Sequence, residues 1–140
     1  MASRVLLIES DDVLRGAIVR AMRARGVGVD ALEASDAIAA VERGAVYERA
    51  LIDLDLRGTD GVSVAEVLLA RLPELEITFA AGGVDAKVLV RAHALGTLVW
   101  KPIGFGPLCD RFGMPSRRSS TILKKVELPV EGARDRASNE

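Results

Sequence analysis

Along the first 112 residues, short apolar runs alternate with segments whose apolar residues recur three and four positions apart. The apolar runs predict buried strands, and the three-and-four spacing predicts amphipathic helices. Gly26 follows the first such helix and is typical of a left-handed helix end. The predicted strands are residues 5–8, 27–31, 49–56, 76–81 and 97–100. The predicted helices are residues 12–25, 62–72, 85–95 and 107–112, together with one capped by Ser35 and ended by Gly44.

This alternation predicts the fold class. Five strands separated by helices imply parallel strands joined by right-handed crossovers, and therefore an α/β fold. We expect a doubly wound, five-stranded parallel sheet of the flavodoxin-like type, with helices on both faces, in a single domain. Such a sheet binds its ligand beyond the carboxyl ends of its strands, where the strand order reverses. The residues that follow the apolar runs are therefore the candidates for chemistry.

Composition narrows the class of protein. The 140 residues are 49% hydrophobic, which is enough for one domain with a sizeable core, and the net charge of −1 argues against a nucleic-acid surface. No apolar segment has the ~20 residues of a membrane helix, and Glu9 interrupts the first apolar run too early for a signal peptide. The single cysteine, Cys109, is expected to be a small buried hydrophobe. We expect a cytoplasmic protein without nucleic-acid or membrane partners.

The composition changes at Gly113. Residues 113–140 are rich in Ser, Arg, Pro and Gly, and we expect them to form a polar, largely disordered C-terminal tail after a folded domain of residues 1–112. Within the tail, residues 115–128 (PSRRSSTILKKVEL) mix basic and apolar side chains. Two interpretations stay open for this segment, a solvated end and a segment that folds on a partner.

Polar or charged side chains stand at the ends of three of the five predicted strands, and Ala81 ends a fourth. Two carboxylates within ~4 Å repel by about 4 kcal/mol at an effective dielectric constant of 20, so Glu9 and Asp53 need a cation or a proton between them. Oxygen ligands of this kind suit Mg²⁺. Lys101 adds a positive charge that can stabilise a phosphoryl group, and Asp53 can act as its nucleophile. The residues at the strand ends are Glu9, Ser10, Asp53, Asp55, Ala81 and Lys101.

Other polar residues have simpler structural interpretations. Asp11 and Asp12 are expected to cap the first helix or to favour its dipole, and Asp60 is expected to be a turn residue beside Gly61. His93 lies on the fourth predicted helix without a phosphotransfer motif around it, so we expect a surface or packing residue.

The strand-end residues resemble those of the CheY-like receiver domains of two-component response regulators. The resemblance covers residues 4–112 and rests on RVLLIESDD, ALIDLDLRGTDG and VWKP. It implies that Asp53 is the phosphorylated aspartate and that Lys101 is the lysine that acts with it, followed by a peptide bond to Pro102 that is often cis. It also implies that Glu9, Asp53 and the backbone carbonyl of Asp55 hold Mg²⁺, Glu9 through water.

Three positions depart from the family pattern. Ser10 stands where the second acid, a direct Mg²⁺ ligand, normally lies, so this ligand is weak or lost and the metal should bind weakly. Ala81 stands where a hydroxyl normally contacts the phosphoryl group, with Thr78 as the alternative if the short loop before the fifth strand is aligned differently. Leu98 stands at the aromatic switch position. Trp100, two residues on, is either a displaced switch residue or simply a large residue that covers the sheet.

Two functions follow from the resemblance. The first is a stand-alone response-regulator receiver that accepts a phosphoryl group on Asp53 from a histidine kinase or phosphotransfer protein. Its output would be contact of the fourth helix and fifth strand with an unknown downstream protein, with autophosphatase activity at most. The alternative, favoured by Ser10 and Ala81, is a pseudo-receiver, an interaction module that signals without phosphorylation.

Two further classes are disfavoured. A phosphohydrolase or nucleotide-binding enzyme lacks a phosphate-cradling glycine loop, and we expect no second lysine or arginine in the cluster. No segment after Phe112 is long or periodic enough for a helix-turn-helix.

Overall fold

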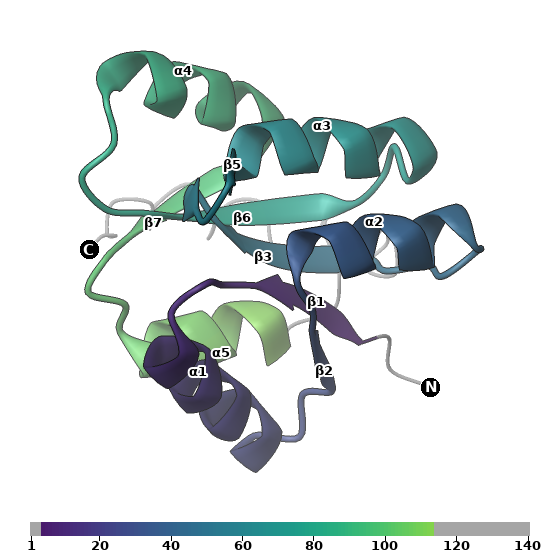
Figure 1. The fold of residues 1–140 in the computed structure, drawn as a ribbon. Helices are drawn as coiled ribbons and strands as arrows, with labels where there is room; N and C mark the ends of the chain where they lie inside the picture. The colour runs from purple at the N-terminus through teal and green to yellow at the C-terminus, as the bar shows by residue number, and fades with distance from the viewer. Residues whose placement is uncertain (1–3, 114–140) are drawn as a thin grey trace, which may run out of the picture.

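The computed structural model describes residues 4–113, in which the strands form a five-stranded parallel sheet in the order β2-β1-β3-β6-β7 (Figure 1). The predicted α/β fold with a doubly wound parallel sheet is confirmed. Three predicted strands have the expected bounds, whereas the second is shorter and the third is divided. The sheet consists of β1 (Val5–Ile8), β2 (Val29–Ala31), β3 (Arg49–Asp53), β6 (Glu76–Ala81) and β7 (Thr97–Trp100).

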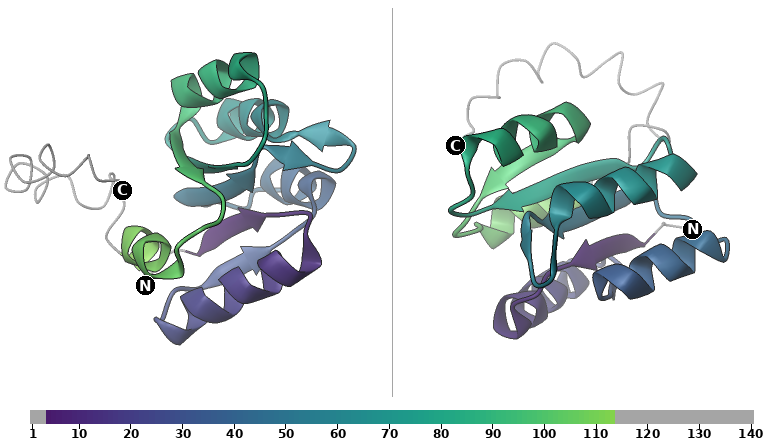
Figure 2. Two further views of the ribbon diagram at one scale, coloured as in Figure 1. Left: turned by 90° about the vertical axis from the view of Figure 1, so that its left-hand side faces the viewer. Right: turned by 45° about the horizontal axis from the view of Figure 1, so that its top comes forward.

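Helices cover both faces of this sheet. Helices α2, α3 and α4 lie on one face and α1 and α5 on the other (Figures 1 and 2). The helices are α1 (Asp12–Ala24), α2 (Ala34–Glu42), α3 (Gly61–Arg71), α4 (Ala86–Leu95) and α5 (Phe105–Gly113). Among the described residues, none of these helices has the length and apolar character needed to cross a membrane.

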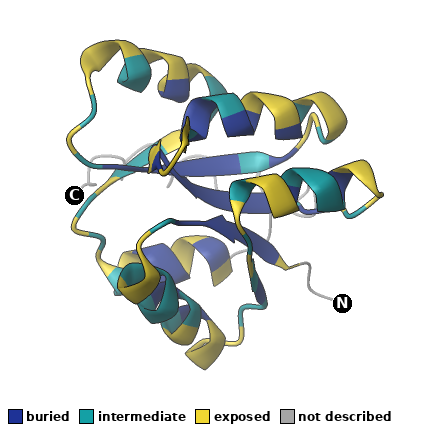
Figure 3. Ribbon diagram, in the orientation of Figure 1, coloured by how far each residue is buried: buried dark blue, intermediate teal, exposed yellow. Residues whose placement is uncertain are grey.

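Successive residues of the central strands contribute to two separate cores. Leu6 and Ile8 of β1 pack in the core under α2, α3 and α4, and Val5 and Leu7 pack in the core under α1 and α5. Because both faces of the strand are covered, the strand is an unbroken apolar run with no polar alternation. Figure 3 shows the result, a buried sheet between helices whose outer sides are exposed. Cys109 is buried in the second core, as expected.

The third predicted strand is divided in the structure. Strand β3 ends at Asp53, and β4 (Asp55–Leu56) pairs antiparallel with β5 (Thr59–Asp60) to form a separate hairpin. Gly58 lies in this turn with φ of 79°, a left-handed conformation that glycine adopts at little cost. The prediction that residues 49–56 form one strand was therefore wrong, because the acidic end of the apolar run turns out of the sheet.

Helices α1, α3 and α4 lie within one residue of their predicted bounds, whereas α2 and α5 start differently from the prediction. Helix α2 begins at Ala34, so Glu33 and not Ser35 is the N-cap residue, and the Glu33 side chain makes no capping hydrogen bond. We attribute the earlier start to Ala34, which packs against the core. Helix α5 begins two residues early, at Phe105, which packs against the second core. The predictions for the tail, including residues 115–128, concern residues outside the described range apart from Gly113.

The strand order places a ligand site between two strands. Strand β1 pairs with β2 on one side and β3 on the other, so the chain reverses its direction of winding there. The carboxyl ends of β1 and β3 open into a crevice at such a reversal. Glu9 follows β1 directly, and Asp53 is the last residue of β3.

Candidate functional site

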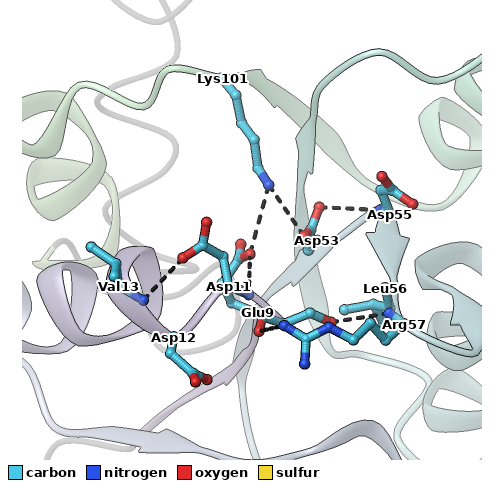
Figure 4. Close-up of a pocket in the computed structure, with 10 residues that line it drawn as sticks. Glu9, Asp11, Asp12, Val13, Asp53, Asp55, Leu56, Arg57 and Lys101 are labelled. Carbon is cyan, nitrogen blue, oxygen red and sulfur yellow. Dashed lines mark hydrogen bonds and ion pairs between the residues drawn. The ribbon is translucent and has the colours of Figure 1, made fainter.

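Three charged side chains from separate strand ends meet in this crevice. The Nζ atom of Lys101, just after β7, lies 3.2 Å from Oδ2 of Asp53 and 3.7 Å from Oε2 of Glu9. The side chains of Asp53 and Glu9 are 3% and 2% exposed, and that of Lys101 is 27% exposed. Figure 4 shows the lysine reaching down to both carboxylates. The convergence expected from the sequence is present, with Asp53 facing the crevice and not the packed interior.

Backbone amides hold the two carboxylates in place. The N–H of Asp55 donates to Oδ1 of Asp53 at 3.1 Å, so Lys101 and this amide contact different oxygens of the same carboxylate. The N–H of Asp11 donates to Oε2 of Glu9 at 3.1 Å. These bonds form because the chain turns sharply after β1 and after β3. Both carboxylates are thereby aimed into one pocket.

Burial and the nearby charge of Asp53 favour the protonated form of Glu9. Burial, followed by the hydrogen bond and the negative charge of Asp53, raises the pKa of Glu9 to about 7, although the Asp11 amide and Lys101 act in the opposite direction. Burial alone would lower the pKa of Lys101, but the hydrogen bond and charge of Asp53 hold it above its usual value. A permanently charged lysine therefore neutralises one carboxylate, and the other readily takes a proton or a cation.

Gly61 fixes the loop against the acidic strand end. A Cβ atom built on Gly61 would lie 2.3 Å from the backbone oxygen of Asp53, a distance that real side chains do not reach. The Gly61 N–H also donates to the carbonyl of Leu54 at 3.1 Å. Only glycine lets α3 begin this close to the backbone of Asp53.

Other acids near the site have structural partners. Asp11 is the N-cap of α1 and accepts from the N–H groups of Val13 and Leu14, as expected. Asp60 proves to be the N-cap of α3, where it accepts from the N–H of Ser63 at 2.7 Å. The side chain of Asp55 is exposed.

Arg57 was missed by the sequence reasoning. It lines the pocket, so the expectation of no second lysine or arginine in the cluster was wrong. Its backbone N–H donates to Oγ of Ser10 at 3.1 Å, and its guanidinium donates to the carbonyl oxygen of Ser10 at 2.9 Å. The signal was the arginine two residues after Asp55, but only the β4–β5 hairpin brings it back to Ser10.

The two predicted switch positions, Ala81 and Leu98, carry apolar side chains that are neither polar nor aromatic. Ala81 is fully buried at the end of β6, and its carbonyl accepts from the Lys101 N–H at 2.9 Å. Leu98 is half-buried against the core under α3 and α4. Trp100 is 56% exposed, so it covers little of the sheet, and Thr78 is buried inside β6.

The remaining expectations near the site concern His93 and Pro102. His93 is exposed on α4, as expected of a surface residue. The peptide bond between Lys101 and Pro102 is cis, as the resemblance implied.

The donor set tests whether Mg²⁺ suits this pocket. Glu9, Asp53 and the backbone carbonyl of Asp55 are hard oxygen ligands, and magnesium sites commonly use only one or two carboxylates. Among residues 4–113, however, no three His, Cys, Asp or Glu side chains are grouped to hold a metal ion. The Ser10 hydroxyl already accepts a hydrogen bond from Arg57. This donor set would hold magnesium only weakly.

No protein-family model matches the chain, and no curated protein matches it. Solved structures do. A CheY-like response regulator receiver domain protein from Methanospirillum hungatei aligns with a TM-score of 0.72 at 19% identity, over 79% of this chain and 90% of that one. A response regulator receiver protein from Sinorhizobium medicae aligns with a TM-score of 0.71 at 20% identity, over 80% and 92%.

A third neighbour is the receiver domain of a Francisella response regulator, with a TM-score of 0.69 at 16% identity over 80% of this chain and 94% of that one. These likenesses arise from the shared arrangement of strands and helices, since so few residues are identical. The chain therefore has the fold of the CheY-like receiver domains.

Proposed function

We propose that this protein is a response-regulator receiver that accepts a phosphoryl group on Asp53 and signals through protein–protein contacts. The observation that carries the proposal is the meeting of Asp53, Glu9 and Lys101 at the carboxyl ends of three strands, with Lys101 Nζ 3.2 Å from the Asp53 carboxylate. Burying a carboxylate costs free energy even when a lysine and a backbone amide contact it, so such a group in a pocket indicates a ligand site.

Each residue has a defined role in this proposal. An oxygen of Asp53 forms the bond to phosphorus, and the bond from phosphorus to the donor breaks, with its electron pair leaving on the donor. The Asp55 N–H and Lys101 orient the Asp53 carboxylate, and Lys101 stabilises negative charge on the phosphoryl oxygens. Glu9, Asp53 and the Asp55 carbonyl would hold Mg²⁺ weakly, and the bound ion would help to stabilise the negative charge of the phosphoryl oxygens.

We infer that the donor is a histidine kinase or a phosphotransfer protein and that the output surface lies on α4 and β7. Val90 on α4 is 70% exposed and Trp100 on β7 is 56% exposed. Large apolar side chains in water favour a protein partner, because their burial stabilises a complex. The pocket and this surface meet at the end of β7, where Trp100 directly precedes Lys101.

The test uses acetyl phosphate as a small phosphoryl donor, with magnesium present. Intact mass and Trp100 fluorescence are followed for the full chain and for Asp53→Asn. A gain of one phosphoryl group in the wild type and none in the variant supports the proposal. An unchanged mass at high magnesium and donor concentration contradicts it.

The alternative is a pseudo-receiver, which keeps the fold and signals without phosphorylation. Ser10 and Ala81 favour it, because they remove a carboxylate ligand and a phosphoryl-contacting hydroxyl from their expected positions. In that case Asp53→Asn would bind the downstream protein as well as the wild type does, with or without the donor.

A further inference from the structure

Ser10 and Arg57 form a coupled pair across the pocket. The residue that replaces the expected second acid uses its two oxygens to hold one arginine, through the Arg57 backbone N–H at 3.1 Å and the guanidinium at 2.9 Å. The hairpin carrying Arg57 is thereby tied to the end of β1, 47 positions away. Ser10 is therefore more than a lost acid, since its hydroxyl holds the backbone of Arg57 and its carbonyl oxygen holds the guanidinium.

The positive charge of Arg57 is not taken up by an ion pair in the described residues, although it acts at longer range on Asp11 of the same pocket. Both of its acceptors on Ser10 are neutral, and among the described residues no ion pair joins Arg57 to a carboxylate within 4 Å. An aspartate at position 10 would instead pair with the guanidinium and cancel its charge. The guanidinium carries five N–H donors, so several remain after the contact with the Ser10 carbonyl.

Ser10 and Arg57 together change the net charge of the pocket by as much as one divalent metal ion would. Compared with a pocket that has a carboxylate at position 10 and an uncharged residue at position 57, Ser10 removes one negative charge and Arg57 adds one positive charge. The difference of two charges equals that of one Mg²⁺. Figure 4 shows Lys101 and Arg57 reaching the pocket from opposite sides, with the carboxylate groups of Glu9 and Asp53 between them.

We propose that Arg57, positioned by Ser10, supplies the charge that a divalent cation would otherwise supply, so that Asp53 takes up a phosphoryl group without metal. This inference rests on the proposed function and assigns the charge source of the same site. With acetyl phosphate, an Asp53 oxygen bonds to phosphorus, the bond from phosphorus to the acetate oxygen breaks, and acetate leaves with that electron pair. No net proton is transferred, and no other reactant is needed. Arg57 and Lys101 bracket the phosphoryl oxygens during the step.

The experiment incubates the full chain with acetyl phosphate in EDTA and, separately, in magnesium, and measures phosphoryl uptake by intact mass. The wild type is expected to react in EDTA at a rate close to that in magnesium. Arg57→Gln is expected to lose about tenfold or more in EDTA and to regain much of that rate in magnesium. Arg43→Gln, an exposed arginine outside the pocket, is the matched control and should behave like the wild type.

A second variant tests the pair if Arg57→Gln folds poorly. Ser10→Asp is expected to suppress uptake in EDTA and to tighten Mg²⁺ binding by about tenfold or more, measured by titrating Trp100 fluorescence with the metal alone. Arg57→Lys, which keeps the charge, should retain part of the rate in EDTA.

Two results would overturn the inference, and they differ in scope. Uptake by the wild type only in magnesium, with Arg57→Gln indistinguishable from it, removes the role of Arg57 and leaves the proposed function standing. No uptake under either condition removes the proposed phosphorylation and this inference together.

Discussion

The Nζ atom of Lys101 lies 3.2 Å from Oδ2 of Asp53, although the two residues are 48 positions apart in the chain. The pair links the carboxyl end of β3 to that of β7, across the strand β6 that lies between them. Asp53 and its neighbour Glu9 are almost fully buried, so water solvates their carboxylates poorly. Lys101 contacts both of them and supplies the positive charge that water does not.

Replacing this lysine should lower the free energy of unfolding. Lys101→Ala removes the contacts to Asp53 and Glu9 and leaves both carboxylates without their cation, so we expect a loss of about 2 kcal/mol at neutral pH. Urea unfolding measures the free energy of unfolding, with Lys87→Ala, an exposed lysine on α4, as the control. Equal stability of the two variants would show that the pair contributes nothing.

The raised pKa of Glu9 predicts how stability depends on pH in magnesium-free buffer. Because the pKa of Glu9 is 4.5 in the unfolded chain and about 7 in the folded one, its contribution is fully present below pH 4.5 and is lost as the pH rises to about 7. Glu9→Gln should therefore be more stable than the wild type at neutral pH, with the difference vanishing toward pH 4.5.

Unfolding curves in EDTA across this pH range measure the effect. Glu42→Gln, an exposed substitution at the end of α2, is the control. A constant offset between Glu9→Gln and the wild type at every pH would contradict the prediction.

Gly61 is expected to tolerate no side chain. In Gly61→Ala the new methyl group would lie 2.3 Å from the Asp53 carbonyl oxygen, so the start of α3 must move away and we expect a loss of about 3 kcal/mol. At Gly83 a Cβ atom meets nothing within 4 Å, which makes Gly83→Ala the matched control. Thermal unfolding of both variants is the measurement, and a Gly61→Ala protein as stable as the control would refute the close approach.

The cap at Asp60 should contribute stability that acid removes. Hydrogen bonding from the Ser63 N–H is the main reason that the pKa of Asp60 is lower in the folded protein than its usual 3.8. The cap therefore stabilises α3 above pH 3.8 and loses this effect as the pH falls through the folded pKa.

We expect Asp60→Ala to lose about 1 kcal/mol at neutral pH, and less in acid. Asp36→Ala, in the first turn of α2 but not at its N-cap, should change little. Urea unfolding at neutral and acidic pH compares them, and a pH-independent loss in Asp60→Ala would count against the charged cap.

Much of the fold was predictable because it depends on local patterns. Strands β1, β6 and β7 have the predicted bounds, because each is a short run rich in apolar residues that is directly followed by a charged residue or a glycine. The start of α2 was not predictable, because the packing of Ala34 on the core outweighs the capping preference of Ser35.

The sequence by itself determined the parallel α/β class and the candidates Glu9, Asp53 and Lys101, because the carboxyl ends of parallel strands share one edge of a sheet. Only the tertiary structure decided that Arg57 joins them. Its contact with Ser10 depends on a hairpin that turns out of the sheet after Asp53, and pairing between Leu56 and Thr59 leaves no periodic pattern in so short a segment. Long-range geometry, which the spacing of residues does not encode, therefore determined the charge of the pocket.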